Sequence, residues 1–268
     1  TKVSRGGGPG GFNSTAGGNG QFDFKPEYDE SVEVGLKADY DIGPIAARTD
    51  LAMFHDDYTD IQKTVITVNA QNLSVLSITN AAAATIQGLE LEQTFIPFEG
   101  LNVKAGWGYT DAHFKNNLSE AEFAADCPAD PATQPNFGFC PLNRLAETPQ
   151  NTLNLGVHYT VPFSDSIGSV TFGGDLYHRS SMSISDTSYI NPDSVLPSLT
   201  TLNVDAEWNS VLGQPLDITF FMTNATNQTY VIAGPFLSQF SSVGVSSYEY
   251  APPRMFGFTV RYHFGGDN

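Results

Sequence analysis

The chain has 268 residues, of which only 15% are charged, while glycine (25), phenylalanine (19) and tyrosine (11) are abundant. Such a composition suits many strands and turns and argues against a helical enzyme. The 12 Lys and Arg against 29 Asp and Glu give a formal net charge of −17, which repels phosphate backbones and argues against a nucleic-acid partner.

Neither a membrane-spanning helix nor a secretory signal is recognisable. No run approaches the ~18 to 20 consecutive apolar residues that a spanning helix requires, and residues 1–4 do not have the pattern of a signal peptide. Three possibilities follow: the protein is soluble, it crosses a membrane as strands, or its beginning lies upstream of residue 1.

The first 28 residues predict the stub of a strand followed by a loop. Residues 6–28 are Gly-rich and polar and begin with Gly6, so we expect one long outer loop there. From about residue 28 onward, apolar and polar residues alternate with a period of two, which predicts strands with one apolar side.

We predict nine strands from this alternation. Each is close to the ~9 to 11 residues of a tilted membrane strand, whereas strands of soluble sandwiches have ~5 to 6 residues. In chain order they cover residues 31–40, 45–57, 82–96, 101–110, 153–161, 169–181, 201–208, 216–224 and 256–264.

The connections between these strands alternate between short and long. Outer-membrane barrels have tight periplasmic turns and long extracellular loops, so we assign the short connections to the periplasm. The residues at 64–79 predict a hairpin that extends two strands beyond the membrane. The short turns cover residues 41–44, 97–100, 164–168 and 211–215, and the long loops cover residues 58–81, 114–147, 182–198 and 225–248.

The alternation also assigns side chains to two sides of a barrel wall. In hydrocarbon, every backbone polar group must be paired inside the protein, so the strands can cross only as parts of a closed barrel, apolar side outward. Aromatic residues near strand ends predict interfacial girdles: Tyr40, Tyr109, Tyr159, Trp208, Tyr262 and Phe264. Twelve charged residues are predicted to face the lumen: Glu33, Lys37, Arg48, Asp50, Glu90, Glu92, Lys104, Asp175, Arg179, Asp205, Glu207 and Arg261.

The two cysteines lie close together in the longest loop. Cys127 and Cys140 lack the histidine or second cysteine pair of a zinc site, so we predict a local disulfide and an oxidising compartment, with two free thiols as the alternative.

No pattern of catalytic, cofactor or metal chemistry emerges. The five histidines are scattered over different strands, and neither a Gly-x-Ser-x-Gly elbow nor a phosphate-binding glycine loop is present. Acidic residues 56, 57 and 60 suit either a calcium site or, as we favour, a solvated loop. We therefore predict no enzyme, cofactor or metal, and a small-molecule ligand that contacts loop aromatics: Tyr230, Phe236, Phe240, Tyr248 and Tyr250.

Five sequence segments stand out together: residues 24–37 (FKPEYDESVEVGLK), 52–62 (AMFHDDYTDIQ), 80–92 (NAAAATIQGLELE), 224–230 (NATNQTY) and 253–258 (PRMFGF). In order and spacing, they resemble the barrel of TonB-dependent outer-membrane receptors from about residue 11 to 264. The resemblance implies a 22-stranded barrel of which this chain holds roughly the last nine strands, an N-terminal plug that the chain lacks, and coupling through that plug to the TonB energy complex.

The sequence therefore predicts an all-β transmembrane barrel segment in three parts: a strand stub and outer loop (1–28), barrel strands (29–264) and a periplasmic tail (265–268). We expect a receptor in the outer-membrane lipid for energised uptake of a ferric siderophore, a cobalamin-like compound or a glycan. A passive porin and a soluble β-rich lectin or adhesin are the alternatives. The order of the motifs argues against the porin, and the strand length argues against the lectin.

Overall fold

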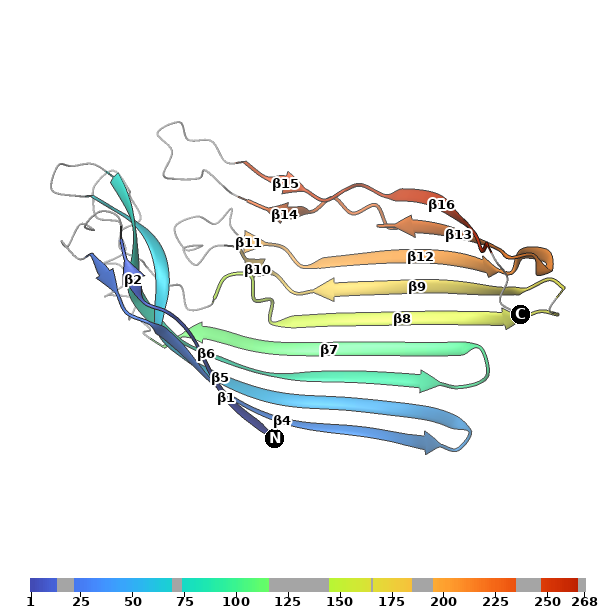
Figure 1. Cartoon of the computed structure of the whole chain (residues 1–268), viewed down its shortest axis with the longest axis horizontal. Helices are drawn as coiled ribbons and strands as arrows, with labels where there is room; N and C mark the ends of the chain where they lie inside the picture. The colour runs from blue at the N-terminus through green and yellow to red at the C-terminus, as the bar shows by residue number, and fades with distance from the viewer. Residues whose placement is uncertain are drawn as a thin grey trace.

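The computed structural model describes residues 1–13, 22–68, 74–115, 145–164, 166–184, 195–234 and 247–264. Ten strands form one antiparallel sheet in the order β1-β4-β5-β6-β7-β8-β9-β12-β13-β16, so each strand pairs with its neighbours along the chain (Figure 1). β1 and β16 are the two edges of this open sheet.

The nine predicted strands are confirmed, as is the strand before them. The sheet consists of β1 (Lys2–Gly8), β4 (Glu27–Ile42), β5 (Ile45–Val68), β6 (Ser74–Ile96), β7 (Leu101–Phe114), β8 (Asn151–Pro162), β9 (Ser169–Arg179), β12 (Leu199–Asn209), β13 (Leu216–Thr223) and β16 (Met255–Tyr262).

The short connections all lie at one end of the sheet, here called the short-turn end, and the long loops lie at the opposite, long-loop end (Figure 1). Glycines with positive φ shape the turns. Gly168 (φ 89°) comes so close to the backbone carbonyls of Asn209 and Ser210 that a Cβ would collide with both. Gly43 (φ 62°) has open space instead, so only its backbone conformation calls for glycine.

The predicted hairpin at the long-loop end is confirmed. β5 and β6 have 24 and 23 residues, and their pairing continues to Val68 opposite Ser74. Figure 1 shows this hairpin curving away beyond the other strands. Three short pairs lie in the long connections: β2 (Gly11–Phe12) with β3 (Asp23–Phe24), β10 (Met182–Ser183) with β11 (Val195–Leu196), and β14 (Val231–Ala233) with β15 (Glu249–Tyr250).

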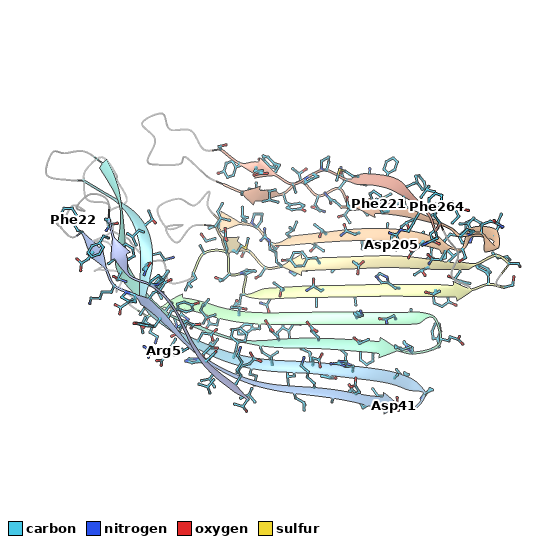
Figure 2. All side chains as sticks on the ribbon, viewed as in Figure 1. Arg5, Phe22, Asp41, Asp205, Phe221 and Phe264 are labelled. Carbon is cyan, nitrogen blue, oxygen red and sulfur yellow. The ribbon has the colours of Figure 1, made fainter. Side chains whose placement is uncertain are left out.

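Both boundaries of the predicted first loop, residues 6–28, differ from the structure, because β4 already begins at Glu27. β1 continues through Gly8, which pairs with Glu27, so three glycines of the predicted loop belong to the sheet. Glycines have no side chain, so residues 6–8 show no alternation of apolar and polar side chains and the sequence does not predict a strand at these positions. Figure 2 shows Phe22, from the remainder of this segment, at the far long-loop end, and Asp41 at the short-turn end.

One face of the sheet, here called the apolar face, carries large hydrophobic side chains in continuous rows. Leu36, Leu51, Leu91, Trp107 and Leu153 lie directly opposite one another across five strands. Leu36 is 59% exposed and Leu153 is 40% exposed. A continuous apolar patch that spans five strands is unfavourable in water, so we expect this face to contact an apolar medium or partner.

The height of this apolar belt suits a bilayer. On β7 it extends from Leu101 to Tyr109, which at ~3.4 Å per residue and a ~40° tilt is about 21 Å, close to the ~25 Å of outer-membrane barrels. Trp208, towards the short-turn end, donates from Nε1 to the carbonyl of Ile167 (2.8 Å), and Trp107 donates to Asn151 Oδ1 (3.2 Å). The indole groups therefore combine an apolar ring with a satisfied donor.

Within the described part of the chain, no helix is long and apolar enough to cross a bilayer.

Candidate functional site on the polar face of the sheet

The opposite side of the sheet, here called the polar face, gathers the charged residues predicted to face the lumen. Lys37 lies opposite Asp50, and Asp50 lies opposite Glu92. At the other edge, Asp217 lies opposite Arg261. Because directly opposite residues share a face, the register places all twelve predicted residues together, which confirms the predicted alternation.

A hollow of about 970 Å³ opens on the middle of this face. Its walls come from β6, β7, β8, β9 and β12, and most of its lining side chains carry polar groups. The polar-face residues that line it are Glu92, Thr94, Asn102, Lys104, Gly106, Asn154, Gly156, His158, Asp175, Tyr177 and Asn203.

Small residues make room for the charged groups of this hollow. Gly156 lies between Lys104 and Asp175, and a Cβ on Gly156 would meet Asp175 Oδ1 at 2.8 Å. Asp175 Oδ1 is 3.3 Å from His158 Nε2. The hollow is therefore deep beside Gly156, which has no side chain. The carboxylate of Asp175 lies there next to the imidazole of His158.

Charges of both signs alternate on the polar face near the short-turn end. Arg48 Nε donates to Asp50 Oδ2 (3.2 Å), and a terminal nitrogen of Arg48 is 3.6 Å from Asp39 Oδ1. Ion pairs of an exposed guanidinium such as that of Arg48 add little stability, because solvent screens them. They make the face polar and wettable, as a water-filled or plugged lumen requires.

An apolar cluster interrupts the polar face at the long-loop end. Phe114 is 1% exposed and packs with Ile61 and Ala84, and Tyr58 and Leu145 cover them in part. The sequence does not predict this cluster, because the alternation places residues 58 and 114 in loops. The available signal was Ala84, whose small side chain lets Phe114 approach from the neighbouring strand.

Acidic groups next to this cluster are partly desolvated. Burial, and secondarily the charge of Asp56, raises the pKa of Asp29. Burial also raises the pKa of the Tyr58 hydroxyl, with further contributions from Asp29, Asp56 and Glu27. The long-loop end of the polar face thus combines negative charge with a phenolic ring.

On the apolar face, charged groups appear above the belt at the same end. Lys115 Nζ is 2.7 Å from Asp57 Oδ1, and His55 Nε2 is 3.5 Å from the same oxygen. The hydrogen bond from Lys115 is the main reason why the pKa of Asp57 is lowered. Arg5 pairs with Glu30 (3.5 Å) on the neighbouring strands.

The structure places three of the five predicted ligand-contacting aromatics at the base of one loop. Tyr230 is half-buried and Tyr250 is 59% exposed, and the carbonyl of Tyr230 accepts a hydrogen bond from the amide of Ala251 (2.9 Å). Tyr248 is half-buried beside Gly234. Phe236 and Phe240 lie outside the described residues.

The predicted disulfide between Cys127 and Cys140 also lies outside the described residues, as does the tail at 265–268. In the described ranges, no three His, Cys, Asp or Glu side chains are grouped to hold a metal ion. Asp56 and Asp57 extend to opposite faces of β5, which argues against the calcium alternative at that position.

Three solved structures show the same fold. The ferric yersiniabactin uptake receptor FyuA of Yersinia pestis has a TM-score of 0.68 and 16% identity, covering 98% of this chain and 34% of its own. BauA, the ferric preacinetobactin receptor of Acinetobacter baumannii, has a TM-score of 0.61 and 19% identity, covering 97% and 33%. The ferripyoverdine receptor of the outer membrane of Pseudomonas aeruginosa has a TM-score of 0.64 and 16% identity, covering 97% and 30%.

The chain therefore spans about a third of the length of these receptors. Residues 1–227 match the family described as "TonB dependent receptor-like, beta-barrel". With an apolar face that fits a bilayer, a polar face that fits a lumen, and this match over most of its length, the chain belongs to the β-barrel family of TonB-dependent receptors.

Proposed function

We propose that this chain forms part of the wall of an outer-membrane receptor that takes up an iron–siderophore complex with energy supplied through TonB. The family match carries the proposal, because it separates a TonB-dependent barrel from a passive porin with the same alternation. The solved receptors with this fold that name ferric siderophores support iron as the cargo.

The two faces of the sheet suit the two partners in this proposal. Lipid surrounds the apolar face, and the polar face with its hollow lines the path that the ligand takes. A plug domain from the same receptor fills that path at rest, and a pull through TonB opens it. The wall supplies selectivity and insulation, and it carries out no chemical conversion.

Ligand capture takes place at the long-loop end. Tyr250 is well exposed there, and Tyr230 lies on the paired segment. Flat aromatic side chains offer contact area at low conformational cost, which suits an organic chelate. Phe236, Phe240 and Tyr248 belong to the same loop and are proposed to contribute.

Transport assays with three probes test this function. The probes are radioactive iron supplied with iron-limited culture medium of the source strain, labelled cobalamin, and a fluorescent glycan. We expect deletion of the receptor gene to abolish uptake of the iron probe alone, and we expect deletion of tonB to abolish it equally. Re-expression of the receptor in the first strain should restore uptake.

Two results would overturn the proposal. Uptake of the iron probe at the parental rate in the receptor-deleted strain would remove the assigned cargo. Receptor-dependent uptake that persists without TonB would indicate passive diffusion, as in a porin.

A further inference from the structure

Two of the sequence segments noted above, at 224–230 and 253–258, meet in space although more than 20 residues separate them. The first follows the end of β13, and the second leads into β16. Between them lies the loop that carries Tyr230 and Tyr250. Their contacts explain why asparagine occurs twice in the first segment.

Asn224 is the centre of these contacts. The residue is almost fully buried (5% exposed), and its backbone is left-handed (φ 49°), a conformation that asparagine tolerates better than most residues. Its Nδ2 donates to the carbonyls of Gln228 (2.8 Å) and Pro252 (3.4 Å), and its Oδ1 accepts from the Gln228 amide (2.8 Å). One side chain thus fixes the turn and reaches the far end of the loop.

Asn227 makes the second connection. Its Oδ1 accepts a hydrogen bond from the backbone amide of Arg254 (3.1 Å), and its own backbone is also left-handed (φ 54°). Further out, the Ala251 amide donates to the Tyr230 carbonyl, and Val231 pairs with Tyr250. These four contacts join the two ends of the loop.

The turn is also anchored to the sheet. The Asn224 amide donates to Asn203 Oδ1 (3.0 Å), and the Ala225 amide donates to the Leu202 carbonyl (2.7 Å), both on β12. Because β12 is an internal strand of the sheet, the base of the loop has a fixed position relative to the barrel wall.

We infer that Asn224 and Asn227 form a clasp that closes the base of this loop and positions Tyr230 and Tyr250 for ligand capture. Both asparagines are positioning residues, acting through the loop and not by touching the ligand. The effect on capture rests on the proposed function, whereas the closure of the loop does not.

Across the loop, Asn224 donates through its Nδ2, whereas Asn227 accepts through its Oδ1. The same substitution at the two positions therefore has different expected effects. Asn224 must donate to two carbonyls, so Asn224→Asp places a carboxylate against them. Asn227 is needed as an acceptor, so Asn227→Asp retains its bond to Arg254. Both substitutions change size and charge identically.

Hydrogen exchange of the intact receptor in lipid nanodiscs measures loop closure without any ligand. In peptides from residues 225–234 and 247–254, we expect Asn224→Asp to speed exchange by about tenfold, as loss of a buried hydrogen bond would. Asn227→Asp should exchange like wild type. Peptides from β8 should be unchanged in both, which shows that the barrel is folded.

The same variants are then compared in uptake of the iron probe. We expect Asn224→Asp to raise the half-saturating concentration about tenfold at an unchanged maximal rate, while Asn227→Asp matches wild type. Unchanged exchange in Asn224→Asp, or equal opening in both variants, would overturn the clasp. Faster exchange with unchanged half-saturation would overturn its role in capture. If the wild-type receptor takes up no iron probe, the proposed function is wrong. The hydrogen-exchange comparison still tests whether the clasp closes the base of the loop.

Discussion

At the scale of the residue, the contact between Lys115 and Asp57 makes the stability of the long-loop end depend on pH. The pKa of Asp57 in the folded protein is lowered, first by the hydrogen bond from Lys115. A carboxyl with a lowered folded pKa stabilises the fold above its unfolded pKa of ~3.9, and that contribution is lost as the pH falls through the folded value. The contact therefore acts at neutral pH and is absent in strong acid.

Replacing Asp57 should reveal this pH dependence. We expect Asp57→Asn to lower the urea midpoint of the receptor at pH 7, and we expect the difference from wild type to shrink in acid as the pH falls through the lowered folded pKa of Asp57. Asp60→Asn, with the same charge change three residues away, serves as the control and should leave the midpoint at pH 7 unchanged. A difference for Asp57→Asn that persists undiminished in acid would contradict the assignment.

At the scale of the element, strands and turns were predictable from the sequence because they depend on local patterns. Alternation identified β8 and β16, and turn residues such as Gly43 identified the short connections. Contacts between distant segments were not predictable. Phe114 was assigned to a loop because its partners Ile61 and Ala84 are known only from the register, and the clasp at Asn224 required the position of Pro252.

The short turns differ in how strongly they require glycine. Gly168→Ala adds a Cβ that collides with two carbonyls at a positive φ, whereas Gly43→Ala meets open space at a similar φ. We expect Gly43→Ala to cost about 1 kcal/mol and Gly168→Ala about 3 kcal/mol or more. Urea unfolding of the receptor in lipid vesicles measures both. Equal costs would show that the collision at Gly168 is relieved by a small backbone shift.

At the scale of the whole molecule, the sheet is an open wall with two faces of different chemistry. In hydrocarbon, the free edges of β1 and β16 must be paired, so strands outside this sheet are needed to complete a barrel. Phe256 and Phe258 on β16 are both 69% exposed, more than Leu155 (38%) on the internal strand β8. The unpaired edge accounts for this difference.

The chemistry of the two faces predicts that the apolar face meets lipid and the polar face meets the lumen. Single spin labels at successive positions from 153 to 159 of β8 test it in the intact receptor, with Cys127 and Cys140 replaced by serine. We predict that labels at 153, 155, 157 and 159 are accessible to oxygen dissolved in the lipid, and that labels at 154, 156 and 158 are accessible to a polar nickel complex. An inverted pattern, or equal accessibility to both reagents at every position, would contradict this orientation of the sheet.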